Sequence, residues 1–345
     1  MNIAIIGATG YSGAELLRFL RNHPHVRRCY LYSSSQEGIH LSESFAHVGE
    51  IEDAVLQKID VEQIANECEV VFFATPPGVS STLAPAFIDQ GVKVIDLSGD
   101  FRLKDGAVYE TWYKRQAASD HYLQQAVYGL TEWNKPNIQE ARLLSNPGCY
   151  PTATLLGLAP LVKEQLIEEN SIIVDAKSGV SGAGRKASLN THFSEVNENV
   201  KIYKVNSHQH IPEIEQMLQT WNERIQPITF STHLIPMTRG IMATIYAKAK
   251  QPLSVDMLVD LYKTSYKDSI FVRIRKPGQF PSTKEVYGSN YCDIGVAYDE
   301  RTGRITVVSV IDNLVKGAAG QAIQNFNVMM GWNEESGLTY MPIYP

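Results

Sequence analysis

The sequence is poor in cysteine, in long apolar runs and in positive charge. Its 345 residues contain four cysteines, at positions 29, 68, 149 and 292, and none forms a CxxC pair or a zinc-binding spacing. No apolar run approaches the roughly 20 residues that cross a bilayer. The formal net charge of −6 gives no electrostatic basis for binding nucleic acid. We therefore expect a cytoplasmic protein with reduced thiols that binds no metal, nucleic acid or membrane.

A hydrophobic content of 44% and a length of 345 residues indicate two globular domains. In the first half, apolar strand patterns alternate with helical ones, which predicts an α/β fold with a Rossmann-type, doubly wound parallel sheet. The second half predicts an α+β domain with a mixed, largely antiparallel sheet, in which strands 229–237 and 241–247 pair with each other. Residues 105–140 show no clear periodicity and indicate a long connection with one short helix. We assign 1–148, completed by the C-terminal helix 313–345, to one domain and 149–312 to a catalytic and dimerisation domain.

A glycine-rich turn follows the first apolar strand and precedes a helical pattern. Glycines at positions 7, 10 and 13 give the spacing GxxGxxG. Such a turn lets the backbone approach a dinucleotide pyrophosphate, which the helix N-terminus then binds. The predicted cofactor contacts in this turn are Gly7, Thr9, Gly10, Tyr11, Ser12 and Gly13.

The second strand ends in hydroxyl side chains and not in the acid that an NAD site would place there. Ser33, Ser34 and Ser35 stand at this end, with Arg27 and Arg28 upstream. This pattern favours the 2′-phosphate of NADP, although the serines could simply cap the following loop.

Two further strand ends lie at the same predicted edge of the sheet. Thr75 and Pro76 follow one strand and are predicted to contact the cofactor. Arg102 follows the other, where it could bind an anion or form a local salt bridge with Asp100.

Cys149 is the predicted nucleophile. The tight corner Pro147–Gly148 precedes it, and an apolar helical pattern follows. A thiol at a helix N-terminus faces unpaired N–H groups and the positive end of the helix dipole, which favour the thiolate. The alternative is a small buried apolar side chain.

Two histidines, His208 and His210, directly precede another helix start, where they are candidates for acid–base catalysis. A glycine- and serine-rich loop over residues 177–185 is a further candidate for contact with phosphate or nicotinamide. A thiolate, a dinucleotide fold and a histidine together indicate reduction of a small-molecule acyl phosphate through a thioester, in which Arg102 or Arg185 meets the phosphate.

Several segments resemble the N-acetyl-γ-glutamyl-phosphate reductase family: GATGYSGAELLR at 7–18, SNPGCYPTAT at 145–154, KSGVSGAGR at 177–185, HQHIPEIEQ at 208–216 and DNLVKGAAGQA at 312–322. The resemblance implies NADPH-dependent reduction of N-acetylglutamyl 5-phosphate to the semialdehyde, a step of arginine biosynthesis. It also implies a cytoplasmic homodimer or homotetramer.

In this family the nucleophile falls on Cys149 and the acid–base group within His208-x-His210, where we lean slightly to His208. The other expected cofactor contacts are Ser178, Gly179, Gly182 and Asn313, and the expected substrate contacts are Arg102, Asn146, Arg185 and Glu213. Two alternatives stay open. Aspartate-semialdehyde dehydrogenase shares the chemistry, but Asn precedes its cysteine where this chain has Gly148. A catalytically silent NADP-sensing regulator would not need the thiol and the imidazoles together.

Overall fold

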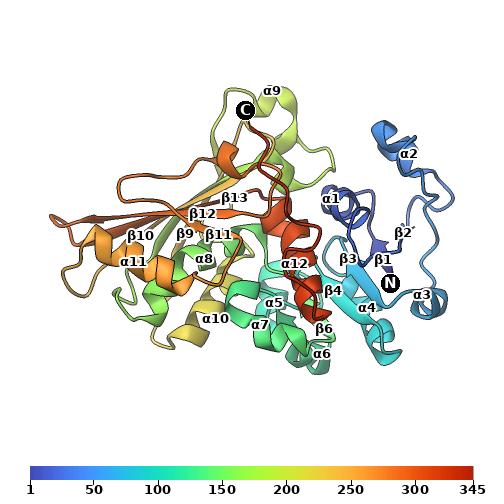
Figure 1. Cartoon of the computed structure of the whole chain (residues 1–345), viewed down its shortest axis with the longest axis horizontal. Helices are drawn as coiled ribbons and strands as arrows, with labels where there is room; N and C mark the ends of the chain where they lie inside the picture. Colours follow the sequence, from blue (N-terminus) through green and yellow to red (C-terminus); the bar gives the residue numbers. More distant parts are fainter. Residues whose placement is uncertain (345) are drawn as a thin grey trace. The chain divides into compact units, whose positions relative to one another are not determined.

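A computed structural model describes residues 1–344 of the chain (Figure 1). The chain forms two compact units. Unit 1 comprises Met1–Pro147 and Ala318–Thr339, and unit 2 comprises Gly148–Gly317 together with the residues from Tyr340 onward. The chain thus leaves unit 1 just before Cys149 and re-enters it near the C-terminus.

Unit 1 is built on a six-stranded sheet in the order β2-β1-β3-β4-β6-β5, and every strand pairing is parallel. The strands are β1 (Asn2–Ile6), β2 (Arg28–Tyr32), β3 (Val70–Phe73), β4 (Lys93–Asp96), β5 (Val127–Tyr128) and β6 (Leu143–Ser145). The helices in chain order are α1 (Tyr11–Leu20), α2 (Leu41–Ser44), α3 (Val61–Glu67), α4 (Ser80–Asp89), α5 (Gly106–Tyr113), α6 (Asp120–Gln125), α7 (Thr131–Gln139) and α12 (Gly320–Met329). The predicted doubly wound α/β fold is confirmed.

The prediction of a long connection over residues 105–140 is wrong. This stretch holds α5, α6, β5 and α7. Asp105 caps α5, because its carboxylate accepts hydrogen bonds from the N–H groups of Ala107 and Val108. The helices are short and rich in aromatic and polar residues, so they carry little apolar periodicity.

Helix α12 is buried along its whole length within unit 1 (red in Figure 1). The Phe326 ring packs edge-on against the Phe72 ring of β3, with centroids 5.4 Å apart. Its polar side chains are hydrogen-bonded, as between Asn327 Oδ1 and His23 Nε2 at 2.8 Å. The core of unit 1 therefore depends on a helix that begins more than 170 residues after the last strand of this unit.

Unit 2 is built on a seven-stranded mixed sheet in the order β11-β12-β13-β10-β7-β9-β8. Its strands are β7 (Ile173–Gly179), β8 (Lys201–Tyr203), β9 (Thr229–Ile235), β10 (Ile241–Lys248), β11 (Val272–Ile274), β12 (Cys292–Asp299) and β13 (Arg304–Ile311). Its helices are α8 (Cys149–Lys163), α9 (Phe193–Val196), α10 (Ile211–Trp221) and α11 (Val255–Ser265). The predicted largely antiparallel character is confirmed, since only the β7–β9 and β11–β12 pairs are parallel.

The predicted pairing of β9 with β10 is wrong, because β7 lies between them. The connection from β9 to β10 crosses the end of β7, where the N–H of Gly179 donates to Gly240 O and that of Val180 to Met237 O. A Cβ at Gly179 would lie 2.7 Å from Thr238 O. Glycine at this position lets the connection pass over the strand.

Helix α8 packs on one face of this sheet. At its middle, a Cβ on Gly157 would meet Ile245 of β10 at 2.9 Å and Val307 of β13 at 3.4 Å. Residues Tyr150–Val162 are all buried. Only the first residue, Cys149, is half-buried. The thiol thus lies at the partly accessible end of the most deeply packed helix of unit 2.

Candidate functional site

The glycine-rich turn of unit 1 follows β1 at the carboxyl edge of the parallel sheet. Gly7 has φ +92°, and a Cβ there would lie 2.5 Å from Ala74 O. A Cβ on Gly13 would lie 2.4 Å from Gly7 O. Gly10 begins α1 without a side-chain cap, so the first-turn N–H groups of α1 point to a ligand position.

The other predicted cofactor residues of unit 1 lie at the same strand ends. Thr75 follows β3, and among residues 1–344 its buried Oγ1 has no hydrogen-bond partner. Ser34 and Ser35 follow β2 and are exposed, whereas Ser33 is buried and its Oγ accepts the N–H of Ser35. A crowded glycine turn, an uncapped helix start and an unpaired hydroxyl fit a phosphate-bearing dinucleotide.

The prediction that Arg27 and Arg28 support binding of the NADP 2′-phosphate is wrong. Both residues lie at the amino end of β2, the end opposite Ser33. The Arg27 Nε donates to Asn2 Oδ1, and the Arg28 guanidinium stacks over the Tyr30 ring at 4.7 Å. A strand of five residues is about 16 Å long, so neither arginine belongs to the carboxyl edge. The serines remain as the basis of this argument.

Arg102 and Asn146 meet at the carboxyl ends of β4 and β6. Arg102 is buried, and its guanidinium donates to Asn146 O at 2.8 Å and to Leu97 O at 2.9 Å. The Asp100 carboxylate accepts from the N–H groups of Gly78 and Ser81 and from two hydroxyls at the start of α4 and in α5.

The thiol turn of unit 2 comprises Gly148 and Cys149. The Gly148 carbonyl accepts from the N–H and the Oγ1 of Thr152, both at 2.9 Å, which starts α8. Its N–H donates to Glu213 Oε1 at 2.8 Å. A Cβ on Gly317 would lie 2.8 Å from the Cys149 Cβ, so the thiol residue packs against bare backbone.

His210 lies directly against this turn. Its Nδ1 is 2.8 Å from Glu213 Oε2, and a Cβ on Gly148 would lie only 2.2 Å from its Cε1. Glu213 is fully buried, and its two oxygens thus bind the thiol turn and the imidazole at once. A carboxylate at Nδ1 fixes the tautomer and leaves Nε2 as the group that can exchange a proton.

His208 has a different environment. Its ring lies among the rings of Tyr150, Tyr203 and Phe230, with centroids 5.4 to 5.9 Å away, and stacks on His210 at 4.9 Å. Its Nδ1 is 3.2 Å from the N–H of His210, which makes it an acceptor. Burial, with a smaller contribution from His210, lowers its pKa from 6.5 to about 2. His208 is therefore neutral at physiological pH.

The sequence did not single out the tyrosine pair that adjoins these imidazoles. The hydroxyls of Tyr150 and Tyr203 are 3.1 Å apart, and the Ser178 hydroxyl also bonds that of Tyr150. Burial raises the pKa of Tyr203 to about 12 and that of Tyr150 further. The position of Tyr150 directly after Cys149 was the one available signal.

Of the other residues of unit 2 predicted to contact cofactor or substrate, one is buried and hydrogen-bonded and two are exposed. Asn313 is buried, and its amide accepts the N–H of Gly240 at 2.7 Å and donates to Ser181 Oγ at 3.0 Å. Gly182 and Arg185 are exposed on the loop after β7.

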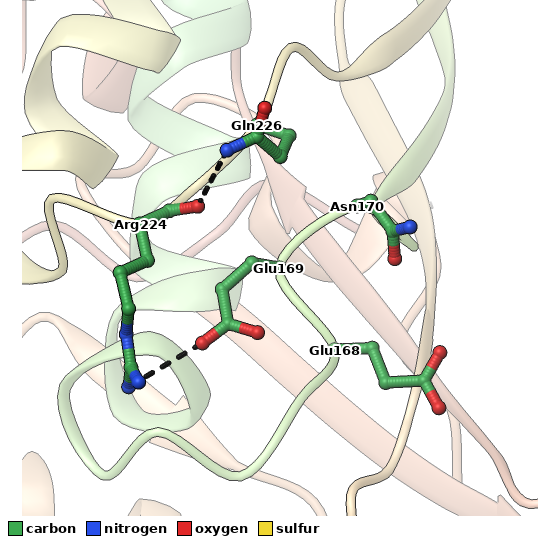
Figure 2. A pocket seen from close by; sticks show the side chains of 5 residues that line it. All are labelled: Glu168, Glu169, Asn170, Arg224 and Gln226. Atoms are coloured by element: carbon green, nitrogen blue, oxygen red, sulfur yellow. Dashed lines mark hydrogen bonds and ion pairs between the residues drawn. The ribbon is translucent and has the colours of Figure 1, made fainter.

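A separate open pocket of unit 2 contains none of the predicted site residues (Figure 2). Its charges are paired: the Arg224 guanidinium is 3.4 Å from Glu169 Oε1, which Lys250 also contacts at 2.7 Å. In the described part of the chain, no cysteine or histidine lines this pocket, so it offers no nucleophile or acid–base group of the kind found at the thiol turn.

Comparison with known proteins agrees with these features. Residues 2–141 match the family model described as semialdehyde dehydrogenase, NAD binding domain, and residues 149–313 match the semialdehyde dehydrogenase, dimerisation domain. Proteins named N-acetyl-gamma-glutamyl-phosphate reductase from Geobacillus sp. (strain WCH70) and Bacillus subtilis (strain 168) are 87% and 61% identical to this chain, over the full length of both partners.

The chain belongs to the N-acetyl-γ-glutamyl-phosphate reductase family. The solved structure of aspartate semialdehyde dehydrogenase II from Vibrio cholerae covers 96% of this chain and 98% of its own, with a TM-score of 0.73. At 20% identity this comparison shows that the chain has the same fold as that dehydrogenase.

Two absences hold for residues 1–344 of this family member. They contain no group of three or more His, Cys, Asp or Glu side chains that could hold a metal ion. No helix in this part of the chain is long and apolar enough to cross a membrane.

A first prediction concerns Gly148 of this reductase-family chain. Gly148→Ala places a methyl group where the His210 ring lies, so the ring or the turn must move. We expect a loss of about 1–3 kcal/mol in unfolding free energy, measured by urea denaturation. The control is the same substitution in a His210→Ala background, where the space is free. An equal loss in both backgrounds would contradict this packing.

A second prediction concerns pH. Because the pKa of folded His208 lies near 2 and the unfolded value is 6.5, the unfolded chain gains a proton below pH 6.5 that the folded chain does not. The free energy of unfolding therefore decreases as the pH is lowered below 6.5, by up to about 1.4 kcal/mol per pH unit. His208→Gln should remove roughly 2 kcal/mol of the loss between pH 6.5 and 5, by urea denaturation at both values. His192→Gln, which removes an exposed imidazole, is the control, and an unchanged pH dependence in His208→Gln would refute the assignment.

Proposed function

We propose that this chain catalyses the NADPH-dependent reduction of N-acetyl-γ-glutamyl phosphate to N-acetylglutamate 5-semialdehyde with release of phosphate. The observation that carries the proposal is the cysteine at the start of α8, directly after a glycine that packs against an imidazole oriented by a buried carboxylate. Family membership supplies the substrate, since a relative that is 87% identical is named for this acyl phosphate.

In this proposal, Cys149 forms the covalent intermediate. Its thiolate attacks the acyl carbon, the new C–S bond replaces the C–O bond to phosphate, and phosphate departs. NADPH, when bound, supplies a hydride to the thioester carbon. The carbonyl oxygen then takes a proton from an imidazolium at the turn, which gives a thiohemiacetal. As that proton returns to the imidazole, the C–S bond breaks and frees the aldehyde and the thiolate. First-turn N–H groups of α8 stabilise the charge on oxygen.

We propose His210, and not His208 toward which the sequence leaned, as the acid–base group. Glu213 binds its Nδ1, so Nε2 is the ring nitrogen that would exchange a proton with the substrate. The low pKa of His208 makes its protonated form inaccessible near neutral pH, which is a poor property for a proton donor. His208 then serves as a neutral, rigid support for the His210 ring.

The proposed contact for the substrate phosphate is Arg185 and not Arg102. Arg185 is exposed, whereas Arg102 is buried and its guanidinium is bound to two carbonyl groups. The glycine turn, the serines after β2 and Thr75 would hold NADP. Glu213, expected to contact substrate, has both oxygens engaged with His210 and Gly148, and we propose it as an orienting residue.

A homo-oligomer, dimer or tetramer, is part of the proposal. The matched dimerisation domain supports it, as does the sheet face of unit 2 opposite α8. Met242, Thr244 and Tyr246 of β10 are half-buried there, beside Asp175 and Lys177 of β7. The cytoplasmic location stays a prediction, supported by four free cysteines.

The main test of the function runs the reaction in reverse, with NADP and phosphate. We expect N-acetylglutamate semialdehyde to be oxidised and aspartate semialdehyde to be a poor substrate. Cys149→Ser should abolish turnover, because an alcohol at this position is far less nucleophilic than a thiolate, while NADPH binding, measured by fluorescence, persists. Preferred oxidation of aspartate semialdehyde, or turnover in Cys149→Ser, would contradict the proposal. A chain that binds NADP and oxidises neither aldehyde would be the silent regulator.

A companion test separates the two histidines. His210→Asn should lower kcat by about 10²-fold or more. Glu213→Gln should also lower kcat, because the amide cannot stabilise an imidazolium, but by less than His210→Asn, since the imidazole itself is still present. His208→Asn should leave the pH profile of kcat in place. If only His208→Asn lost the acid–base step, the roles would have to be exchanged.

A further inference from the structure

Asn146 is the last residue of unit 1 with a polar side chain before the thiol turn, and all its polar groups are engaged within unit 1. Its N–H donates to Asp96 O at 2.8 Å, and its carbonyl accepts from Arg102. Its side-chain Oδ1 accepts from Asn325 Nδ2 at 3.0 Å, and its Nδ2 donates to Ala318 O at 3.1 Å. The side chain is 1% exposed. It has little capacity left for the substrate contact expected from the sequence.

The bonds to Asn146 belong to a directed chain of buried side chains. Gln321 Nε2 donates to Thr131 Oγ1 at 2.8 Å, Thr131 Oγ1 donates to Asn325 Oδ1 at 2.6 Å, and Asn325 Nδ2 donates to Asn146 Oδ1. Each group in this chain can act in one direction only, because the hydroxyl has a single proton and an amide oxygen has none. The orientation of every amide is therefore fixed by its neighbours.

This series of hydrogen bonds is also anchored to the backbone at its middle. The Gly129 carbonyl accepts from Asn325 Nδ2 at 2.7 Å and from Gln321 Nε2 at 3.1 Å. A Cβ on Gly129 would lie 2.4 Å from Asn325 Nδ2, so the amide occupies the space that glycine leaves. Thr131, Gln321 and Asn325 are almost completely buried, so each lost bond leaves an unpaired polar group without water.

We infer that Thr131, Gln321 and Asn325 are positioning residues for the thiol, acting through Asn146. The inference rests on the proposed role of Cys149 as nucleophile. The network holds the backbone of Asn146, and Cys149 follows three residues later across a rigid proline. A displacement of the turn by about 1 Å would misalign sulfur and acyl carbon and can cost on the order of 10²-fold in rate.

Helix α12 offers a matched pair of variants for the test. Asn325 and Asn327 are both fully buried and each makes three hydrogen bonds, but the bonds of Asn327 go to His23, Glu334 and Ser336 and not to Asn146. Asn325→Ser and Asn327→Ser should lower the melting temperature similarly. Only Asn325→Ser should lower kcat, by about 10-fold or more, with KM for NADP unchanged within twofold.

The second readout is the rate at which iodoacetamide alkylates Cys149, followed by mass spectrometry of its peptide. Burial raises the pKa of Cys29 and Cys68 to about 12, so their thiols react slowly. We expect slower alkylation in Asn325→Ser and an unchanged rate in Asn327→Ser. Should Asn325→Ser fail to fold, Thr131→Val removes the hydroxyl at constant shape, and Thr131→Ser should restore kcat.

Equal kcat values and alkylation rates in the two asparagine variants would overturn the inference, as would normal turnover in Thr131→Val. Such a result is distinct from failure of the proposed function, in which the unaltered protein itself lacks phosphate-dependent oxidation of N-acetylglutamate semialdehyde.

Discussion

The candidate site in unit 2 depends on the two hydrogen bonds that the Glu213 carboxylate accepts. The carboxylate has no exposed surface, and burial of an unpaired charge would cost several kcal/mol. One oxygen binds the N–H of Gly148 and the other the Nδ1 of His210. Its place in the first turn of α10 adds the favourable end of the helix dipole. One side chain thereby joins the starts of α8 and α10 and sets the imidazole beside the thiol residue.

Features encoded by neighbouring residues could be predicted from the sequence. The glycine turn, the start of α8 at Cys149 and the start of α10 after His210 all depend on glycine, proline and cap residues within a few positions. The longer strands of both sheets could be found in the same way, whereas the short strands β5 and β8 could not. Their partners could not, because the choice of β7 over β9 as the neighbour of β10 follows from the crossing at Gly179, where two distant backbones meet.

Roles within the site required the fold. His208 and His210 are equivalent in the sequence, and only the packing shows that one lies among aromatic rings while the other faces Glu213. The arginines upstream of Ser33 looked close to it in sequence, but an extended strand carries them to the other edge of the sheet. The side-chain partners of Asn146 are Asn325 of α12 and the carbonyl of Ala318, more than 170 residues later in the chain, and no local pattern connects them.

Helix α12 has a consequence for how the protein is made. All ten residues of this helix are buried and it belongs to unit 1, yet it is synthesised only after residues 148–317 of unit 2. Until then the nascent Rossmann sheet keeps the apolar surface around Phe72 uncovered, including while unit 2 emerges from the ribosome. The core of unit 1 therefore stays incomplete, with apolar surface exposed to association, until the last tenth of the polypeptide has been synthesised.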